Sequence, residues 1–250
     1  MSLHFHRVMS GCSGASSDPG TVRSAVVMAS VVCAFVMSVA PLPASAQCHL
    51  QKLFDENGSS LDRFGETVSI SGPVVTVGPF GFVCRLNGTE WMLEADLDLG
   101  LWTTVDGDRI IGNGPTGIIE SYRYQGGTWV PEGTLIWLEE GEPILFTGPV
   151  SFLGDVAIVG HPLADDACPE DYHCNSGAAY VFRWDGVEWI AEQKLTASDI
   201  SPGAGYGMSV AMDDGRAVIG APTDTYGKAY VVEWDGVSWV EQQTRASAHR

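Results

Sequence analysis

The residue types best suited to chemistry gather in the segment 163–177, LADDACPEDYHCNSG, where four acids surround two cysteines. Carboxylate oxygens are the ligands that hard cations such as calcium prefer. The four acids are therefore candidate metal ligands: Asp165, Asp166, Glu170 and Asp171. The competing interpretation is a solvated surface loop stapled by a disulfide between Cys168 and Cys174, and we favour it because runs of charge are usually of that kind.

Catalytic motifs are absent from the sequence. The chain has no Gly-x-Ser-x-Gly elbow, no His-Glu-x-x-His and no Gly-Lys phosphate loop, and its histidines are scattered singly. We therefore predict no catalytic residue, no cofactor and a protein that is not an enzyme. The alternative is a polysaccharide-active hydrolase, because carboxylates that pair for glycoside hydrolysis meet only in three dimensions.

The N-terminal part of the chain has the order of a secretory signal. Residues 25–40 form an apolar run that a basic residue precedes, and two prolines and an Ala-Ser-Ala site follow it. This order predicts a signal peptide over 1–46 with cleavage after Ala46. The run falls short of the roughly 20 residues that a membrane span needs. We expect a mature domain over 47–250 that is secreted, at the cell surface or periplasmic, with no stable membrane span.

Four cysteines remain after such cleavage: Cys48, Cys84, Cys168 and Cys174. An even number of cysteines in an exported chain predicts disulfides. A local pair between Cys168 and Cys174 would leave Cys48 and Cys84 as the second pair, although four cysteines allow three connectivities. A zinc site that adds nearby histidines to Cys168 and Cys174 is the alternative, but oxidation competes for both thiols.

Charge restricts the class of partner. The chain has 31 Asp and Glu against 13 Lys and Arg, which gives a formal net charge of −18. A surface this acidic disfavours direct binding to nucleic acid or to an anionic membrane. At 250 residues and 45% hydrophobic content, the chain is long enough for one sizeable globular domain.

The elements that must position these residues are copies of one unit. Its clearest copies are AYVFRWDGVEW at 179–189 and AYVVEWDGVSW at 229–239, each of which reads as a β-hairpin closed by a two-residue turn. A hairpin turn followed by tryptophan occurs at Asn87-Gly88, Gly126-Gly127, Asp185-Gly186 and Asp235-Gly236. A second turn and a β-branched run ending in glycine precede each one. Each unit therefore has two hairpins, or four strands.

Four such units predict an all-β fold, a β-propeller of four-stranded antiparallel blades. The units cover approximately 51–100, 101–143, 144–205 and 206–245. Propeller strands bury both faces, so we expect Tyr180 and Phe182 on one face and Val181 on the other. A β-sandwich is the alternative, but it does not require a sequence to recur.

The last unit resembles a known repeat. It opens with Tyr206-Gly207 and continues SVAMDDGRAVIGAP, which is similar to the FG-GAP repeat of integrin α-chain propellers and of many bacterial exported proteins. The resemblance extends over 51–245. Gly160-His161-Pro162 departs from Gly-Ala-Pro by one residue, and Leu101-Trp102 replaces Phe-Gly in the second unit.

In calcium-binding members of this family, an Asp-rich loop precedes the strand that ends in Gly-Ala-Pro. Here that place holds short turns, at Asp106-Gly107-Asp108, Gly154-Asp155 and Asp213-Asp214-Gly215. A calcium cage needs six to eight oxygens from a loop long enough to wrap the ion. We therefore predict turn residues here, and no calcium.

The resemblance implies a non-catalytic module that binds a protein or a carbohydrate, or mediates adhesion. Integrin-type propellers have seven blades, whereas this sequence offers four, so the ring is four-bladed, is completed by another chain, or is incomplete. Incomplete blades would lead to self-association. The segment His49–Leu53 resembles residues 191–195, which suggests that an N-terminal strand pairs with the last blade.

Overall fold

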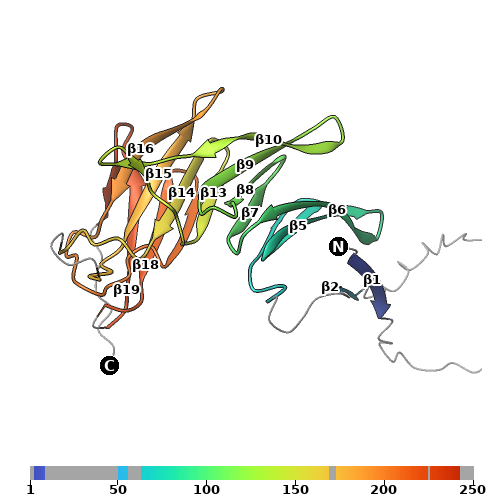
Figure 1. The fold of residues 1–250 in the computed structure, drawn as a ribbon, viewed down its shortest axis with the longest axis horizontal. Coiled ribbons are helices and arrows are strands. Elements are labelled where there is room, and N and C mark those ends of the chain that lie inside the picture. Colours follow the sequence, from blue (N-terminus) through green and yellow to red (C-terminus); the bar gives the residue numbers. More distant parts are fainter. Residues whose placement is uncertain (1–2, 9–49, 56–62, 169–172, 225, 243–250) are drawn as a thin grey trace, which may run out of the picture.

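The computed structural model describes residues 3–8, 50–55, 63–168, 173–224 and 226–242. Regular structure within these residues is all β-strand, as the sequence predicts (Figure 1). A helix long and apolar enough to cross a membrane is not found in this part of the chain. Most of the expected signal peptide, residues 9–46, lies outside the described residues, so its cleavage stays a prediction.

Four antiparallel sheets of four strands each form the blades. Blade 1 consists of β3 (Val68–Ser71), β4 (Val74–Val77), β5 (Phe80–Asn87) and β6 (Glu90–Leu99). Blade 2 consists of β7 (Thr103–Asp106), β8 (Arg109–Asn113), β9 (Ile119–Gln125) and β10 (Thr128–Leu135). Blade 3 consists of β13 (Val150–Leu153), β14 (Val156–His161), β15 (Ala178–Trp184) and β16 (Trp189–Leu195). Blade 4 consists of β17 (Ser209–Asp213), β18 (Arg216–Ala221), β19 (Lys228–Trp234) and β20 (Trp239–Glu241).

The blades succeed one another around a common axis, and the fold is a four-bladed β-propeller. The first strand of each blade lies innermost, so β3 contacts β7, β7 contacts β13, and β13 contacts β17. Figure 1 shows blade 1 in teal at one end of the molecule and blade 4 in orange at the other. The prediction of four-stranded propeller blades is confirmed.

Two further sheets have two strands each. The hairpin of β11 (Leu138–Glu139) and β12 (Glu142–Pro143) connects blades 2 and 3. The strand β2 (Leu50–Asp55) pairs antiparallel with β1 (Leu3–Val8), whereas the sequence suggested pairing with the last blade.

Hydrophobic cores fill the spaces between successive blades. Tyr180 and Phe182 belong to the core between blades 2 and 3, and Val181 belongs to the core between blades 3 and 4. All three are buried, as expected for a strand covered on both faces. Burial of a side chain of this size stabilises the fold by about 1.5–3 kcal/mol. Alternation along one strand therefore holds three blades together.

The glycines of the repeat lie where the backbones of successive blades meet. A Cβ added to Gly160 of blade 3 would lie 2.0 Å from the carbonyl oxygen of Gly207, which leads into blade 4. A Cβ added to Gly207 would lie 2.3 Å from the carbonyl oxygen of Ala178, and Gly207 has a φ of 90°. Only glycine fits this close approach without strain.

The outer hairpins of blades 3 and 4 differ from the expected two-residue turns. Trp184 pairs with Trp189, and Trp234 with Trp239, so four residues form each loop. The φ > 0 position in each loop is the glycine, Gly186 at 102° or Gly236 at 99°. The aspartate before each glycine caps the loop with its side chain. A two-residue turn predicted from the Asp-Gly dipeptide alone does not include this cap.

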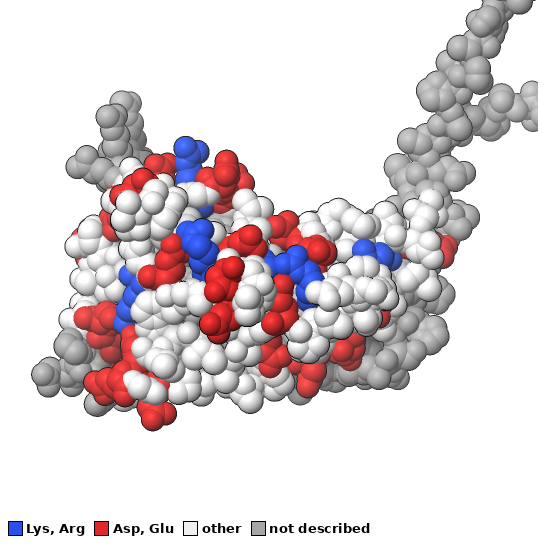
Figure 2. Space-filling model, turned by 90° about the horizontal axis from the view of Figure 1, so that it is seen from above, with Lys and Arg blue, Asp and Glu red and all other residues white. Residues whose placement is uncertain are grey.

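Acidic side chains are spread across the surface. Figure 2 shows them in red over the face seen from above, with a smaller number of basic side chains between them. Several of these pairs are ion pairs, for example Arg85 with Glu94 and Arg183 with Glu192. Both pairs keep partial contact with solvent, which limits what each contributes to stability.

Candidate functional site

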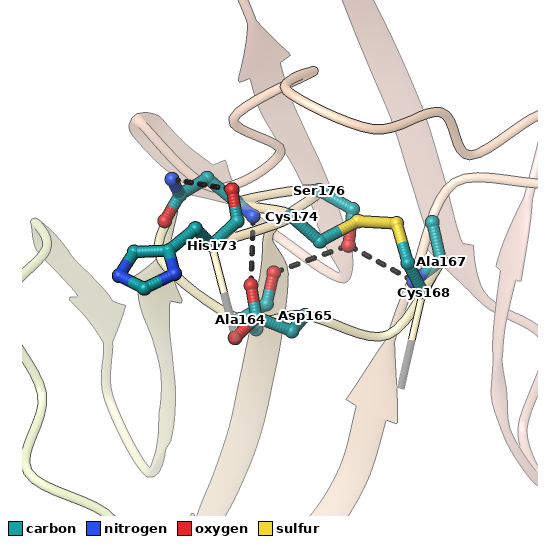
Figure 3. Close-up of a disulfide and its surroundings, with 8 residues drawn as sticks. Ala164, Asp165, Ala167, Cys168, His173, Cys174 and Ser176 are labelled. Atoms are coloured by element: carbon teal, nitrogen blue, oxygen red, sulfur yellow. Dashed lines mark hydrogen bonds between the residues drawn. A yellow bond between two sulfur atoms is a disulfide. The ribbon is translucent and has the colours of Figure 1, made fainter. Parts of the chain in front are cut away.

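The acidic segment 163–177 is held by a disulfide between Cys168 and Cys174, which confirms the local pairing (Figure 3). The Oδ1 of Asp165 accepts the backbone N–H of Asn175 at 2.8 Å. The hydroxyl of Ser176 donates to the carbonyl of Ala164 and accepts the N–H of Ala167, both at 3.1 Å. These bonds tie the two ends of the segment together.

The carboxylate of Asp166 is engaged by a lysine. The Nζ of Lys194 lies 2.7 Å from Asp166 Oδ1 and 2.5 Å from Glu139 Oε1. Burial on its own lowers the pKa of Lys194, but the hydrogen bonds to Asp166 and Glu139 outweigh it and raise the pKa above its usual value. Asp166 thus belongs to an ion-pair network between the segment and blade 3.

Of the four candidate metal ligands, the structure describes two, because Glu170 and Asp171 lie outside the described residues. Those two, Asp165 and Asp166, turn to different partners. The described residues contain no group of three or more His, Cys, Asp or Glu side chains placed to hold a metal ion. The zinc alternative is wrong, because the sulfurs of Cys168 and Cys174 are bonded to each other.

The segment after the disulfide packs against the chain that leads into blade 4. The carbonyl of Cys174 accepts the N–H of Gly203 at 2.6 Å, and the carbonyl of Ser176 accepts the N–H of Tyr206 at 2.9 Å. Gly177 forms a parallel bridge with Tyr206. The segment therefore braces blade 4 against blade 3.

The hairpin acids Asp185 and Asp235 serve as turn residues. Each Oδ1 accepts two backbone N–H groups at 2.8 Å, from Val187 and Glu188 in one loop and Val237 and Ser238 in the other. These backbone hydrogen bonds lower the pKa of both carboxyl groups.

The acids of the short turns where the sequence resemblance would place calcium join neighbouring blades. Asp106 Oδ2 accepts the N–H of Gly154 at 2.9 Å, so it caps the turn of the next blade. Asp155 Oδ1 accepts from Arg109 of the preceding blade at 3.0 Å. The turns that contain them have the left-handed backbone expected, with φ of 58° at Gly107 and 59° at Gly154.

Cys84 is a free cysteine, buried in blade 1. Burial, with a smaller contribution from Glu94, raises the pKa of its thiol to about 11. The thiol is therefore protonated and unreactive at neutral pH. The second disulfide expected from the sequence, between Cys48 and Cys84, is not found, because Cys84 is free; Cys48 itself lies outside the described residues.

A cleft lies at the propeller axis, where the innermost strands of all four blades begin. We call it the axial cleft; it has a volume of about 460 Å³ and is lined by residues 66–69, 102–104, 149–151 and Val210. Strands of a propeller converge at the axis, so their first residues face one another there. The sequence did not indicate this site, because its residues are far apart in the chain and match no local motif.

Hydroxyl groups dominate the polar lining of the axial cleft. Ser69 Oγ lies 3.2 Å from Thr104 Oγ1 and accepts the N–H of Val105 at 3.2 Å. Ser151 Oγ accepts the N–H of Met212, and Thr67 Oγ1 donates to the carbonyl of Leu101. Each hydroxyl has one donor and two acceptor sites, so capacity remains for a ligand.

Two further side chains give the axial cleft a distinct chemistry. The half-buried indole of Trp102 is fixed by its Nε1, which donates to the carbonyl of Thr147 at 3.1 Å. Glu66 is the acid among the lining residues, and its Oε1 accepts from the guanidinium of Arg63. Trp102, Glu66 and several serine and threonine residues thus line one concavity.

Residues 189–232, from the outer strand of blade 3 to the third strand of blade 4, match the family model of the FG-GAP repeat. The chain contains an FG-GAP repeat. Within this FG-GAP repeat, Tyr206-Gly207 and Gly220-Ala221-Pro222 supply the residues that the resemblance rested on. A search of curated proteins finds no match.

Solved structures with a similar fold share little sequence with this chain. One is the Aleuria aurantia lectin in complex with Fucalpha1-6GlcNAc, at 16% identity and a TM-score of 0.46, over 75% of this chain and 66% of that chain. Another is S. cerevisiae Dbp5 bound to Nup159, Gle1, IP6 and ADP, at 11% identity and a TM-score of 0.43, over 71% and 46%. The chain spans less than two thirds of either.

Proposed function

We propose that this FG-GAP repeat propeller is a non-catalytic binding module that takes a carbohydrate in the axial cleft. The observation that carries the proposal is the lining, which combines Trp102 and Glu66 with serine and threonine residues from three blades. A sugar offers hydroxyls that donate and accept hydrogen bonds, and a C–H face that packs on an aromatic ring. The volume of about 460 Å³ lies within the range of small-ligand sites.

Binding of the purified chain to a panel of oligosaccharides tests the proposal. We expect at least one glycan to be retained, and Trp102→Ala to weaken its binding by about 2 kcal/mol, roughly 30-fold, the size of loss seen when an aromatic anchor is truncated. Trp102→Phe keeps an aromatic ring but removes the hydrogen bond to Thr147, and it should retain most of the affinity.

The matched control is Tyr226→Ala, which removes an aromatic ring that is 94% exposed and lies outside the axial cleft. Its affinity should equal that of the unaltered chain. The proposal fails when no glycan in the panel binds, or when Trp102→Ala binds as tightly as Tyr226→Ala.

A polysaccharide hydrolase is the alternative that the same experiment separates. Hydrolysis uses two carboxylic acids placed on either side of the scissile bond. Among the lining residues the acid is Glu66, and Arg63 occupies one of its oxygens. We expect no release of reducing ends from any bound glycan, whereas turnover that Glu66→Gln abolishes would show an enzyme.

An exported location fits a module of this kind. The Cys168–Cys174 disulfide favours an oxidising compartment, and the order of the N-terminal residues is that of a secretory signal. We infer a protein that works outside the cytoplasm, on glycans carried by surfaces or by other secreted proteins. Mass spectrometry of the secreted chain tests this inference, and an N-terminus at Gln47 is the expected result.

A further inference from the structure

The joint between two blades is a repeated structure with two distinct sides. We call the face that a blade turns to the next blade along the chain its forward face, and the opposite face its rear face. On the forward face of blade 1, Ser69 Oγ accepts the N–H of Val105 in blade 2 at 3.2 Å. On the forward face of blade 3, Ser151 Oγ accepts the N–H of Met212 in blade 4, also at 3.2 Å.

The rear face of blade 1 is exposed. Side chains alternate along a strand, so Val68 and Ile70 point away from blade 2, and they are 68% and 66% exposed. The same register positions in blade 3 are Val150 and Phe152, which are buried against blade 2. Blade 1 thus has the apolar rear face of an inner blade without the burial.

The forward face of blade 4 is exposed in the same way. Val218 on β18 is 44% exposed, whereas Ile111 in blade 2 and Ile158 in blade 3, at the same register, are fully buried against the following blade. Beside Val218 lies a hollow of about 270 Å³, lined by Ala211, Met212, Asp213, Arg216, Ala217 and Val218. This hollow is open to receive apolar side chains.

Two glycines of the repeat, Gly65 in front of blade 1 and Gly220 in blade 4, lack the contacts that their counterparts make between blades 3 and 4. Gly65 has a φ of 86°, like Gly207 at 90°, yet a Cβ on Gly65 would have nothing within 4 Å. Gly220 stands at the place of Gly160, but the atoms near its Cβ position all belong to Ser209 of its own blade. In the joint between blades 3 and 4, Gly160 contacts Gly207. Gly65 of blade 1 has no such glycine from a preceding blade beside it, and Gly220 of blade 4 has no such aromatic-glycine pair from a following blade.

Strand β2 occupies the position of a preceding blade's outer strand. Gln193 of blade 3 donates from Nε2 to the carbonyl of Trp239 at 2.9 Å, and its Oε1 accepts the Trp239 N–H at 2.7 Å. Gln51 makes the same two bonds, at 2.9 and 2.7 Å, with Trp91 of blade 1. Blade 1 is therefore arranged as if another blade preceded it.

The two exposed faces also carry the partners of an arginine–tryptophan contact like the one between blades 2 and 3. Arg109 of blade 2 places its guanidinium 5.1 and 4.9 Å from the rings of Trp184 and Trp189 in blade 3. Arg216 holds the position of Arg109 in blade 4, and its side chain is largely exposed. Trp91 holds the position of Trp189 in blade 1. The forward face of blade 4 thus carries an arginine, Arg216, with no aromatic ring of a following blade beside it. The rear face of blade 1 carries the corresponding ring, Trp91.

We propose that the forward face of blade 4 packs against the rear face of blade 1 of a second copy of this chain. Both halves of the joint are on one chain, so two copies related by a twofold axis complete two equivalent joints and leave neither face open. The resulting ring has eight blades, at the upper end of the usual propeller size.

The mass of the purified chain in solution, by light scattering after size exclusion, tests the proposal. The unaltered chain should be a dimer. Ile70→Asp and Val218→Asp each place a carboxylate in the joint, so both should be monomers at concentrations where the unaltered chain is dimeric. Both side chains are exposed in the single chain, so both variants should keep its circular dichroism spectrum.

Val187→Asp is the matched control, because Val187 is 80% exposed in the outer loop of blade 3 and lies on neither open face. It should remain a dimer. A monomeric unaltered chain overturns the proposal, and so does a dimer that both face variants retain.

Cross-linking tests the head-to-tail geometry. Ala211 stands at the strand position of Ser69 and Ser151. The side chains of these serines contact the backbone of the next blade at Val105 and Met212, and Ile70 stands at that same position in blade 1. A mixture of Ile70→Cys and Ala211→Cys chains should form a disulfide-linked dimer on oxidation, and neither variant should do so alone. A cross-link from Ile70→Cys alone would show that the rear face binds itself, which contradicts the proposed joint.

Discussion

Replacement of Arg109 by methionine tests how the blades are held together. The side chain of Arg109 is almost fully buried between blades 2 and 3. It forms a bidentate pair with Glu132, at 2.7 and 3.1 Å, and donates to the carbonyl of Gly154 at 2.5 Å. It also lies over the rings of two tryptophans of blade 3. One side chain therefore joins two blades through ionic, polar and aromatic contacts.

The expected loss follows from what remains after the substitution. Removal of one partner from a buried ion pair costs about 3–5 kcal/mol, because the other charge stays buried. Glu132 retains the guanidinium of Arg123 at 2.9 Å, and methionine keeps contact with the tryptophan rings. We therefore expect a loss near the lower end, about 3 kcal/mol.

Arg183→Met provides the comparison, because Arg183 makes the same kinds of contact with more exposure. It pairs with Glu192 at 2.9 Å and lies over the ring of Trp234 at 4.9 Å. Partly exposed contacts of this kind are worth about 1 kcal/mol. Urea unfolding followed by tryptophan fluorescence measures both variants. If Arg109→Met costs no more than Arg183→Met, the reasoning from burial is refuted.

Two further predictions concern the repeat glycines and a buried histidine. Gly207→Ala should lower the free energy of unfolding by more than about 3 kcal/mol, because its Cβ would clash with backbone. Gly186→Ala has free space but a φ of 102°, so it should cost about 1–2 kcal/mol. Equal midpoints of the two variants in urea would contradict this. Burial lowers the pKa of His161, so the unfolded chain binds its proton more readily, and unfolding free energy should fall below about pH 6.5, by at most about 1.4 kcal/mol per pH unit. His161→Ala should reduce this slope, and an unchanged slope in that variant would count against the role of the buried histidine.

The strands and their pairing follow from local sequence, which is why they could be predicted. The alternation of Tyr180, Val181 and Phe182 fixed which core each side chain enters, and the spacing of Cys168 and Cys174 suited a local disulfide. Turn geometry was less predictable. The loop after Trp184 is longer than its Asp-Gly dipeptide suggests, because Asp185 caps two N–H groups further along the loop.

The axial cleft could not be predicted, because its lining is assembled from the innermost strands of successive blades where they converge at the axis. Glu66, Trp102 and Ser151 come from three blades, and nothing in the sequence near each of them differs from ordinary strand ends. The role of Arg109 was likewise hidden, since its partners Glu132 and Trp189 lie in another strand and another blade. Chemistry that is built between repeats leaves no signature within one repeat.

A crystal structure of the chain soaked with the glycan that binds most tightly tests whether the axial cleft is the binding site. Binding in the axial cleft predicts density for a sugar ring there, packed on Trp102 and hydrogen bonded to Glu66 or to the lining hydroxyls. Density for the sugar on the disulfide-held segment 163–177 or on the outer hairpin loops, with an empty axial cleft, would contradict it.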